Sequence, residues 1–232
     1  MNKKRKLLLA LPIIVILSVV GYTMVLGITP SFDSPNLEFP IPESDRVVRL
    51  SAYHTPDWGE PGVFHNGIDL VISDDVTIVS PVAGTVIGYS EHINPYAGNV
   101  LFEIVIGVNW AFSVNLVLEP GFLDETNNSL QSSMIDVQFG QHVAVGDTLA
   151  TLLFSDNYPH LHYMPAYFGS DVCAYNYSSS AAKSTFDIIA STSNSTIFYP
   201  HSAPNVIASP LVLIPLALVG IYAIVVIIVF RR

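Results

Sequence analysis

Two short motifs combine residue types that can bind a metal ion. The first places His65 and Asp69 four positions apart around Gly67, and the second places His160 and His162 two positions apart in an apolar segment. Zinc is bound by neutral imidazole and carboxylate, and a catalytic zinc site uses three protein ligands and leaves a fourth position for water. Burying two imidazoles side by side is costly unless a polar partner engages them. The two motifs together therefore indicate a metal site.

The spacing within each motif is compatible with one shared ion. His65 and Asp69 can reach the same ion if the turn at Gly67 brings them together. Side chains of an extended segment alternate sides, so His160 and His162 point to one face, where one can ligate metal and the other can face the bound water. We interpret the remaining histidines as surface or core residues: His54, His92, His142 and His201.

These motifs, together with the segment SPVAGTV at residues 80–86, resemble the signature of the lysostaphin-type (LytM-type) zinc endopeptidases, peptidase family M twenty-three. The resemblance covers roughly residues 51–168. It implies that His65, Asp69 and His162 hold Zn²⁺ and that His160 assists catalysis. The implied reaction is amide hydrolysis, in members of the family usually of peptidoglycan cross-bridges or stems. Zinc would polarise the scissile carbonyl and lower the pKa of its bound water towards about 7.

One position departs from the pattern of that family. Its members usually carry a second catalytic histidine in a Tyr-x-His-Leu segment between the two metal motifs, and the best counterpart here places Asn115 at that position. Asparagine can donate a hydrogen bond to an oxyanion, but it cannot exchange a proton near neutral pH. Either Asn115 supports a slow or specialised hydrolase, or the domain keeps zinc and has lost efficient catalysis.

The elements that position these residues are predicted to be β-strands. Residues 46–189 contain short runs of β-branched and aromatic residues broken by Gly, Pro, Asn and Asp, without a convincing stretch of helical period. This pattern is typical of an all-β sandwich or barrel. Residues 77–86 and 140–149 each place a small turn between two apolar strands, which resembles the barrel-sandwich (duplicated hybrid motif) fold. No lysine lies between Lys6 and Lys183, which argues against a biotinyl or lipoyl carrier.

Two apolar runs flank this domain and predict transmembrane helices. Residues 7–27 follow a basic tail at residues 1–6, and residues 210–230 precede two arginines at residues 231–232. Each run is long enough to cross a bilayer, which takes roughly 20 residues. A cleaved signal peptide is the alternative for the first run. Residues 28–45 and 190–209, rich in Pro or in Ser, Thr and Asn, are predicted linkers on either side of the domain at 46–189.

The charges predict the orientation. Each apolar run has basic residues next to it on the side that faces a chain terminus. The positive-inside tendency therefore places both termini in the cytoplasm and the central domain outside the cell. Between the runs, three basic residues stand against nineteen acidic ones. Such a domain disfavours nucleic acid as a partner. A single cysteine, Cys173, excludes an internal disulfide.

The sequence thus predicts a zinc metalloendopeptidase-like protein that is anchored in the cell membrane by two helices and acts on a peptide or peptidoglycan-like substrate. The first alternative is a catalytically degenerate zinc-binding scaffold or regulator of a cell-envelope partner. The second is a barrel-sandwich adaptor of a transport assembly without metal. The oligomeric state is not predicted.

Overall fold

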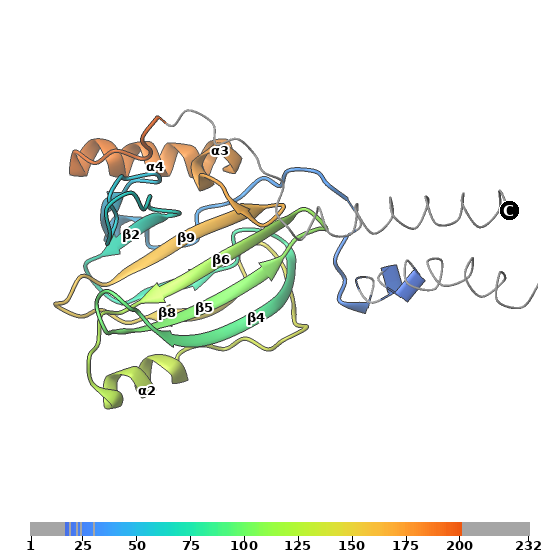
Figure 1. The fold of residues 1–232 in the computed structure, drawn as a ribbon, viewed down its shortest axis with the longest axis horizontal. Coiled ribbons are helices and arrows are strands. Elements are labelled where there is room, and N and C mark those ends of the chain that lie inside the picture. The colour runs from blue at the N-terminus through green and yellow to red at the C-terminus, as the bar shows by residue number, and fades with distance from the viewer. Residues whose placement is uncertain (1–16, 19, 22, 24, 30, 201–232) are drawn as a thin grey trace, which may run out of the picture.

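A computed structural model of the chain describes residues 17–200, apart from positions 19, 22, 24 and 30, as a mainly β structure with a few helices (Figure 1). The predicted β domain is therefore confirmed at this level. The predicted helix at residues 210–230 and both tails lie outside the described residues, and the run at 7–27 lies largely outside them. Among the residues that are described, no helix is long and apolar enough to cross a membrane.

The elements follow one another closely along the chain. The strands are β1 (Val47–Ser51), β2 (Ile68–Ile72), β3 (Val76–Val79), β4 (Gly84–Ile93), β5 (Val100–Gly107), β6 (Phe112–Glu119), β7 (His142–Val143), β8 (Thr148–Leu152), β9 (His160–Tyr167) and β10 (Ser170–Asp171). The helices are η1 (Ser44–Arg46, a 3-10 turn), α2 (Glu125–Ser133), α3 (Ala174–Tyr177) and α4 (Ser180–Ser193).

The main sheet is antiparallel and has the order β1-β2-β9-β6-β5-β4-β7, with β10 paired to β9. A second sheet consists of β3 and β8. In Figure 1, α3 and α4 lie at the β1–β2 end of the main sheet, and α2 lies at the other end, near β4. The strands β2, β9, β6 and β5, far apart in sequence, are therefore neighbours in the middle of the sheet.

The alternation of side chains gives the main sheet two different faces. On β6, Leu116 and Leu118 are fully buried and belong to the hydrophobic core, whereas Asn115, Val117 and Glu119 point the other way. The same alternation on β5 and β9 buries Phe102, Ile104, Leu161 and Tyr163. Because successive residues of a strand face opposite sides, the core fixes which residues face the second side. That second side carries the predicted chemistry.

The two look-alike segments pair with each other. Strand β3 and the turn into β4 come from the first segment, and β7 and the turn into β8 come from the second. β3 pairs with β8 and β4 pairs with β7. The turns also meet, because Ser80 N donates to Asp147 O at 2.8 Å and Gly146 N donates to Ser80 O at 2.9 Å. Each corner therefore satisfies the backbone of the other.

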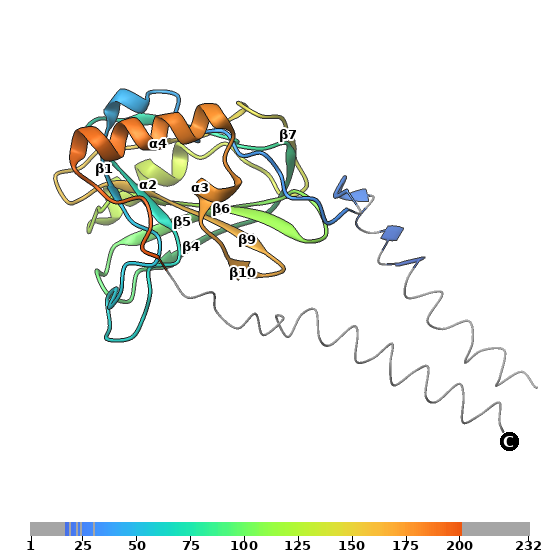
Figure 2. The ribbon, with the colours of Figure 1, turned by 90° about the horizontal axis from the view of Figure 1, so that it is seen from above.

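Helices α2, α3 and α4 correct the expectation that residues 46–189 lack a convincing helical stretch. The last of them, α4, also extends past residue 190, where a linker was expected to begin. The Ser179 side chain caps its first turn by accepting from Ala182 N. Ala182, Phe186 and Ile189 are buried at spacings of four and three, which is the helical period. Seen from above (Figure 2), α4 lies across β1, with which it is in contact. The frequent Ser and Thr residues obscured this short apolar stripe.

The segment predicted as an N-terminal linker is packed against the domain. Leu37 and Ile41 are at most 1% exposed and belong to the core, and Leu37 N donates to Tyr177 O. Prolines disfavour helices and strands in this segment but do not prevent single apolar side chains from being buried. At the other end, Phe198 forms a bridge with Tyr53, so the described part of residues 190–209 also contacts the domain.

Candidate metal centre

Three side chains converge on one point beside the middle of the main sheet. His65 lies just before β2, Asp69 lies on β2, and His162 lies on β9 directly opposite Asp69. Asp69 Oδ1 is 3.0 Å from His65 Nε2 and 2.8 Å from His162 Nδ1, and the two nitrogens are 3.2 Å apart. The three ligand atoms, one from each residue, lie within 4.8 Å of one another, so a single metal ion could be bound by all three. The strand pairing thus joins the two sequence motifs.

The surroundings of His65 hold its ring in one orientation. Its Nδ1 lies 2.8 Å from Ala52 O and, as the N–H donor, leaves the Nε2 lone pair facing Asp69 and His162. Metal-binding histidines commonly donate their second ring N–H to a carbonyl or carboxylate in this way, which fixes the tautomer. The Trp58 ring stacks on His65 at 4.1 Å between centroids. His65 is therefore both oriented and shielded from solvent.

Only one of the two Asp69 carboxylate oxygens has a partner among the described residues. The side chain is fully buried, and Oδ2 has no hydrogen-bond partner among the described residues. Burial alone raises the pKa of Asp69, but its contacts with His162 and His65 and the charge of His160 hold the pKa well below its ordinary value. Buried charges in proteins are paired or coordinate a metal, and the free oxygen of Asp69 is compatible with a metal ion. The residues present therefore fit a zinc ion, with His65 Nε2, Asp69 and His162 Nδ1 as ligands.

His160 lies beside this cluster and is paired with an acid that the sequence interpretation missed. Glu119 on β6 lies directly opposite His160 on β9, with Glu119 Oε1 3.5 Å from His160 Nε2. His160 Nδ1 donates to Tyr158 O at 2.9 Å, so Nε2 faces Glu119 and Asp69. Burial lowers the pKa of His160, but Glu119 and Asp69 together raise it to about 9. These two carboxylates therefore favour the protonated form of His160 at the edge of the cluster.

Asn115, the predicted substitute for a catalytic histidine, lies on the same face of β6 as Glu119 but four residues before it. It pairs with Met164, and its Nδ2 donates to Glu103 Oε1 at 2.9 Å. It is not among the residues that line the pocket described below. Glu119, four residues later and on the same face, contacts His160 instead. The alternation of side chains along β6 places Glu119 on the same face as Asn115 and could have indicated it as a candidate. The register of β6 against β9, which places Glu119 opposite His160, is not visible in the sequence.

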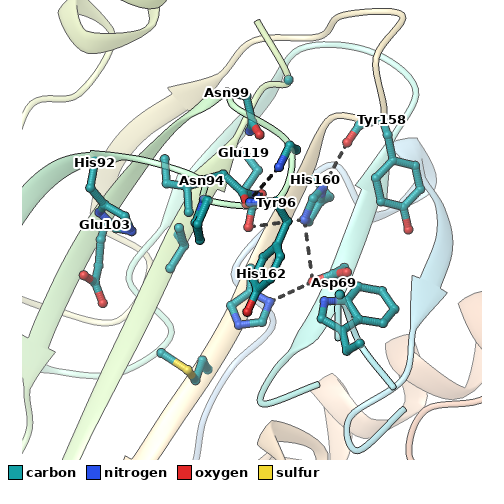
Figure 3. Close-up of a pocket in the computed structure, with 18 of the residues that line it drawn as sticks. Asp69, His92, Asn94, Tyr96, Asn99, Glu103, Glu119, Tyr158, His160 and His162 are labelled. Carbon is teal, nitrogen blue, oxygen red and sulfur yellow. Dashed lines mark hydrogen bonds and ion pairs between the residues drawn. The ribbon is translucent and has the colours of Figure 1, made fainter. Parts of the chain in front are cut away.

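A pocket of about 640 Å³ opens over these residues (Figure 3). In Figure 3, Asp69, His160 and His162 point toward one another at one side of the pocket. Its aromatic lining comes from loops, with Trp58, Tyr96 and Tyr158, and its polar lining includes His92, which we had interpreted as a plain surface or core residue. His142 lies outside the pocket and bonds to Thr85, and His201 lies outside the described residues.

The pocket shape depends on a turn in the β4–β5 connection. Asn94 Oδ1 accepts from Tyr96 N at 2.9 Å, and Asn94 Nδ2 donates to Glu119 Oε2 at 3.4 Å. One side chain therefore shapes the loop that carries Tyr96 and also contacts the partner of His160.

No protein-family model and no curated protein sequence matches the chain. Among solved structures, the chain is similar to one named as a peptidase of family M twenty-three from Pseudomonas aeruginosa, with 21% identity, a TM-score of 0.40, and coverage of 67% of this chain and 56% of that one. It is also similar to a zinc-containing peptidase from Vibrio cholerae (21% identity, TM-score 0.43, 61% of this chain and 40% of that one).

A third similar structure is the catalytic domain of lysostaphin from Staphylococcus simulans, with 15% identity, a TM-score of 0.35, and coverage of 52% of this chain and 80% of that one. The chain thus spans 56% and 40% of the length of the first two structures, which is less than two thirds.

Proposed function

We propose that the chain is a lysostaphin-type zinc metallohydrolase of barrel-sandwich architecture that cleaves peptide bonds. The observation that carries this proposal is the buried cluster of His65, Asp69 and His162, in which Asp69 Oδ2 has no protein partner and is available to a metal ion. The cluster lies in a pocket that also holds His160 and Glu119. A structural metal site is closed by four protein ligands, whereas three protein ligands beside an open pocket are typical of a catalytic one.

The residues divide the work of hydrolysis between them. Zinc bound at this site would supply Lewis acidity and would lower the pKa of a bound water molecule towards neutral pH. His65, Asp69 and His162 hold the ion. His160 presents Nε2 to the pocket, where it can donate a proton or a hydrogen bond to an oxygen that becomes negative. Glu119 stabilises the protonated ring and fixes its orientation.

We further propose that the domain acts outside the cell on peptides of the cell wall or cell surface, tethered by the apolar runs at residues 7–27 and 210–230. The support for the tether and the orientation comes from sequence, because the basic residues lie on the outer flank of each run. The segment between the two runs, with three basic and nineteen acidic residues, would remain soluble beside the membrane.

Metal analysis and hydrolysis together test the proposal. We expect the full chain, purified in detergent, to contain close to one zinc per molecule, and His162→Ala to lose it. We expect the protein to cleave peptidoglycan or glycine-rich peptides and His160→Ala to keep zinc while losing turnover. Zinc binding without cleavage of a broad peptide panel would favour the zinc-binding scaffold. Absence of zinc from the wild-type protein would rule out both metal functions.

A further inference from the structure

Arg49 on β1 lies beside the pocket and has no acidic partner. Whereas Arg46 forms an ion pair with Asp74, the Arg49 guanidinium forms no ion pair and no hydrogen bond with another described residue. It lies over the ring of Tyr158, 4.9 Å from the ring centroid. The segment between the apolar runs carries nineteen acidic residues against three basic ones. An unpaired guanidinium in such a segment is available to an anionic group of another molecule.

Arg49 lines a groove of about 440 Å³ whose lining contains no aspartate or glutamate among the described residues. The rest of the lining is apolar or carries hydroxyl and amide groups. The groove therefore has a local charge opposite to that of the domain around it. Such a place favours an anionic ligand.

The groove adjoins the pocket over the metal cluster, because Trp58 and Tyr158 line both. Trp58 stacks on His65 at 4.1 Å between ring centroids. The Tyr158 ring, labelled in Figure 3, lies 5.1 Å from that of His160. A peptide that extends from the metal cluster past these two aromatic rings reaches Arg49.

The register of the main sheet sets the distance between Arg49 and the catalytic residues. Arg49 pairs with Val71 on β2, and Val71 pairs with His160 on β9. Side chains of directly paired residues lie on the same face of a sheet, so Arg49 shares the face of His160. Two strand spacings amount to about 10 Å. An extended peptide covers this distance with about three residues.

The Tyr158 side chain that carries the guanidinium is held in place. Its hydroxyl and Ser51 Oγ lie 2.7 Å apart and share a hydrogen bond. Its backbone carbonyl accepts from His160 Nδ1 at 2.9 Å. A cation stacked on a fixed aromatic ring is attracted to the ring and loses less freedom when it binds a ligand. Arg49 is therefore preorganised beside the pocket.

We propose that this groove, which we name the arginine subsite (Arg49, Trp58 and Tyr158), binds a carboxylate of the substrate peptide. A guanidinium presents its N–H donors in a planar fork that matches the two oxygens of a carboxylate. The proposal rests on the function proposed above and specifies its substrate class: a peptide with a free carboxylate about three residues from the scissile bond, either at its C-terminus or on an acidic side chain.

The test compares peptides that differ only in the carboxylate. Binding to the zinc-loaded full chain is measured by calorimetry for N-acetyl-tetraglycine against its C-terminal amide, and for N-acetyl-Gly-Gly-Glu-Gly amide against its glutamine analogue. We expect the carboxylate to strengthen binding about fivefold in at least one pair, which is the size expected for a solvent-accessible charge pair. The first pair reports a terminal carboxylate and the second an acidic side chain, so the pair that responds identifies the source.

Two variants locate the effect. Arg49→Gln should abolish the preference for the carboxylate, whereas Lys183→Gln, an equal change of charge on α4 that lines neither the pocket nor the groove, should retain it. A preference that survives Arg49→Gln would mean that the carboxylate binds elsewhere, for example to the zinc ion, and would overturn the proposal. Equal binding within both pairs, or no binding of any peptide, would overturn it as well.

A third variant covers the case in which Arg49→Gln does not fold. Arg49→Lys keeps the charge and the long apolar stem but loses the planar fork, so the preference should fall by at least about half. An undiminished preference in Arg49→Lys contradicts recognition by the guanidinium.

Calorimetry needs no turnover, and mass spectrometry of the recovered peptides reports cleavage separately. Carboxylate-dependent binding through Arg49 without cleavage would support the arginine subsite and contradict the hydrolase function. Cleavage without a preference for the carboxylate would do the reverse, so the two failures are distinguishable.

Discussion

The burial of Asp69 is the most informative feature at the scale of single residues. Burying an ionised carboxylate is expensive and is tolerated when partners or a metal compensate its charge. Two histidines contact Oδ1, and Oδ2 has no partner among the described residues. A His-Asp pair that only stabilises the fold does not need a second histidine or an adjacent open pocket. The arrangement is explained by a cation.

Glu119→Gln tests whether the pair of Glu119 and His160 supports catalysis. The amide keeps the size of the side chain but removes the charge that raises the pKa of His160. We expect the hydrolysis rate to fall by about 10–100-fold while the zinc content stays unchanged, since such supporting contacts typically have effects of this size. Rate and zinc content are measured on the same preparation, with Glu125→Gln as control. An unchanged rate would assign Glu119 a role in binding or stability only.

Gly67→Ala tests the close packing around His162. A Cβ at Gly67 would lie 2.6 Å from His162 Cε1 and 3.0 Å from the carbonyl oxygen of Tyr163, so the ring must move. We expect the zinc affinity, measured by competition with a chelator, to fall by about 10–100-fold. Gly88→Ala is the matched control, because a Cβ there meets Val105 at an ordinary 3.4 Å. Equal affinities of both variants would show that the ring adapts without cost.

At the scale of elements, β9 organises the site and α4 supports the sheet that carries it. β9 alternates between the core, with Leu161 and Tyr163, and the pocket, with His160 and His162. Its neighbours β2 and β6 then supply Asp69 and Glu119 at fixed register. The apolar alternation that stabilises the strand therefore also aligns its two histidines.

Ser179→Ala tests the contribution of α4 to stability. Ser179 Oγ accepts from Ala182 N at 3.1 Å and donates to Glu38 Oε2 at 2.8 Å, so its loss removes the helix cap and a link to the N-terminal segment. We expect the free energy of unfolding to fall by about 1 kcal/mol in denaturant titrations, with zinc binding retained. Ser184→Ala, at an exposed position inside the helix, should be neutral or slightly stabilising. A reversed order of the two variants would contradict the cap.

At the scale of the whole molecule, the site joins segments that lie about a hundred residues apart, from the loop before β2 to β9. A ligand that binds all of them binds only the folded chain. Metal binding and folding are therefore thermodynamically linked.

Removal of zinc should consequently destabilise the domain. With free zinc at about 100 times its dissociation constant, the linkage contributes about 2.7 kcal/mol. For a domain of this size that corresponds to a Tm about 5–10 °C higher with zinc than with a chelator. Differential scanning calorimetry measures the difference, and His162→Ala should show almost none. A wild-type Tm that does not respond to zinc would argue against the metal centre.

The amino-acid sequence by itself determined the candidate ligands, the mainly β character and the shared face of His160 and His162, because these depend on residue type and on a period of two. It did not reveal α4, whose apolar stripe of Ala182, Phe186 and Ile189 is short, or the burial of Leu37 and Ile41 in a Pro-rich segment. Helices and linkers of this kind are stabilised by packing against distant elements.

Only the tertiary structure decided which residues share the pocket. Parity places Asn115, Val117 and Glu119 on one face of β6, but the register against β9 selects Glu119 as the neighbour of His160. Register depends on the fit of whole strands and on the turns between them, which no local pattern encodes. The same long-range pairing brings Glu103 and Asn99 into the pocket and leaves Asp69 Oδ2 without a partner.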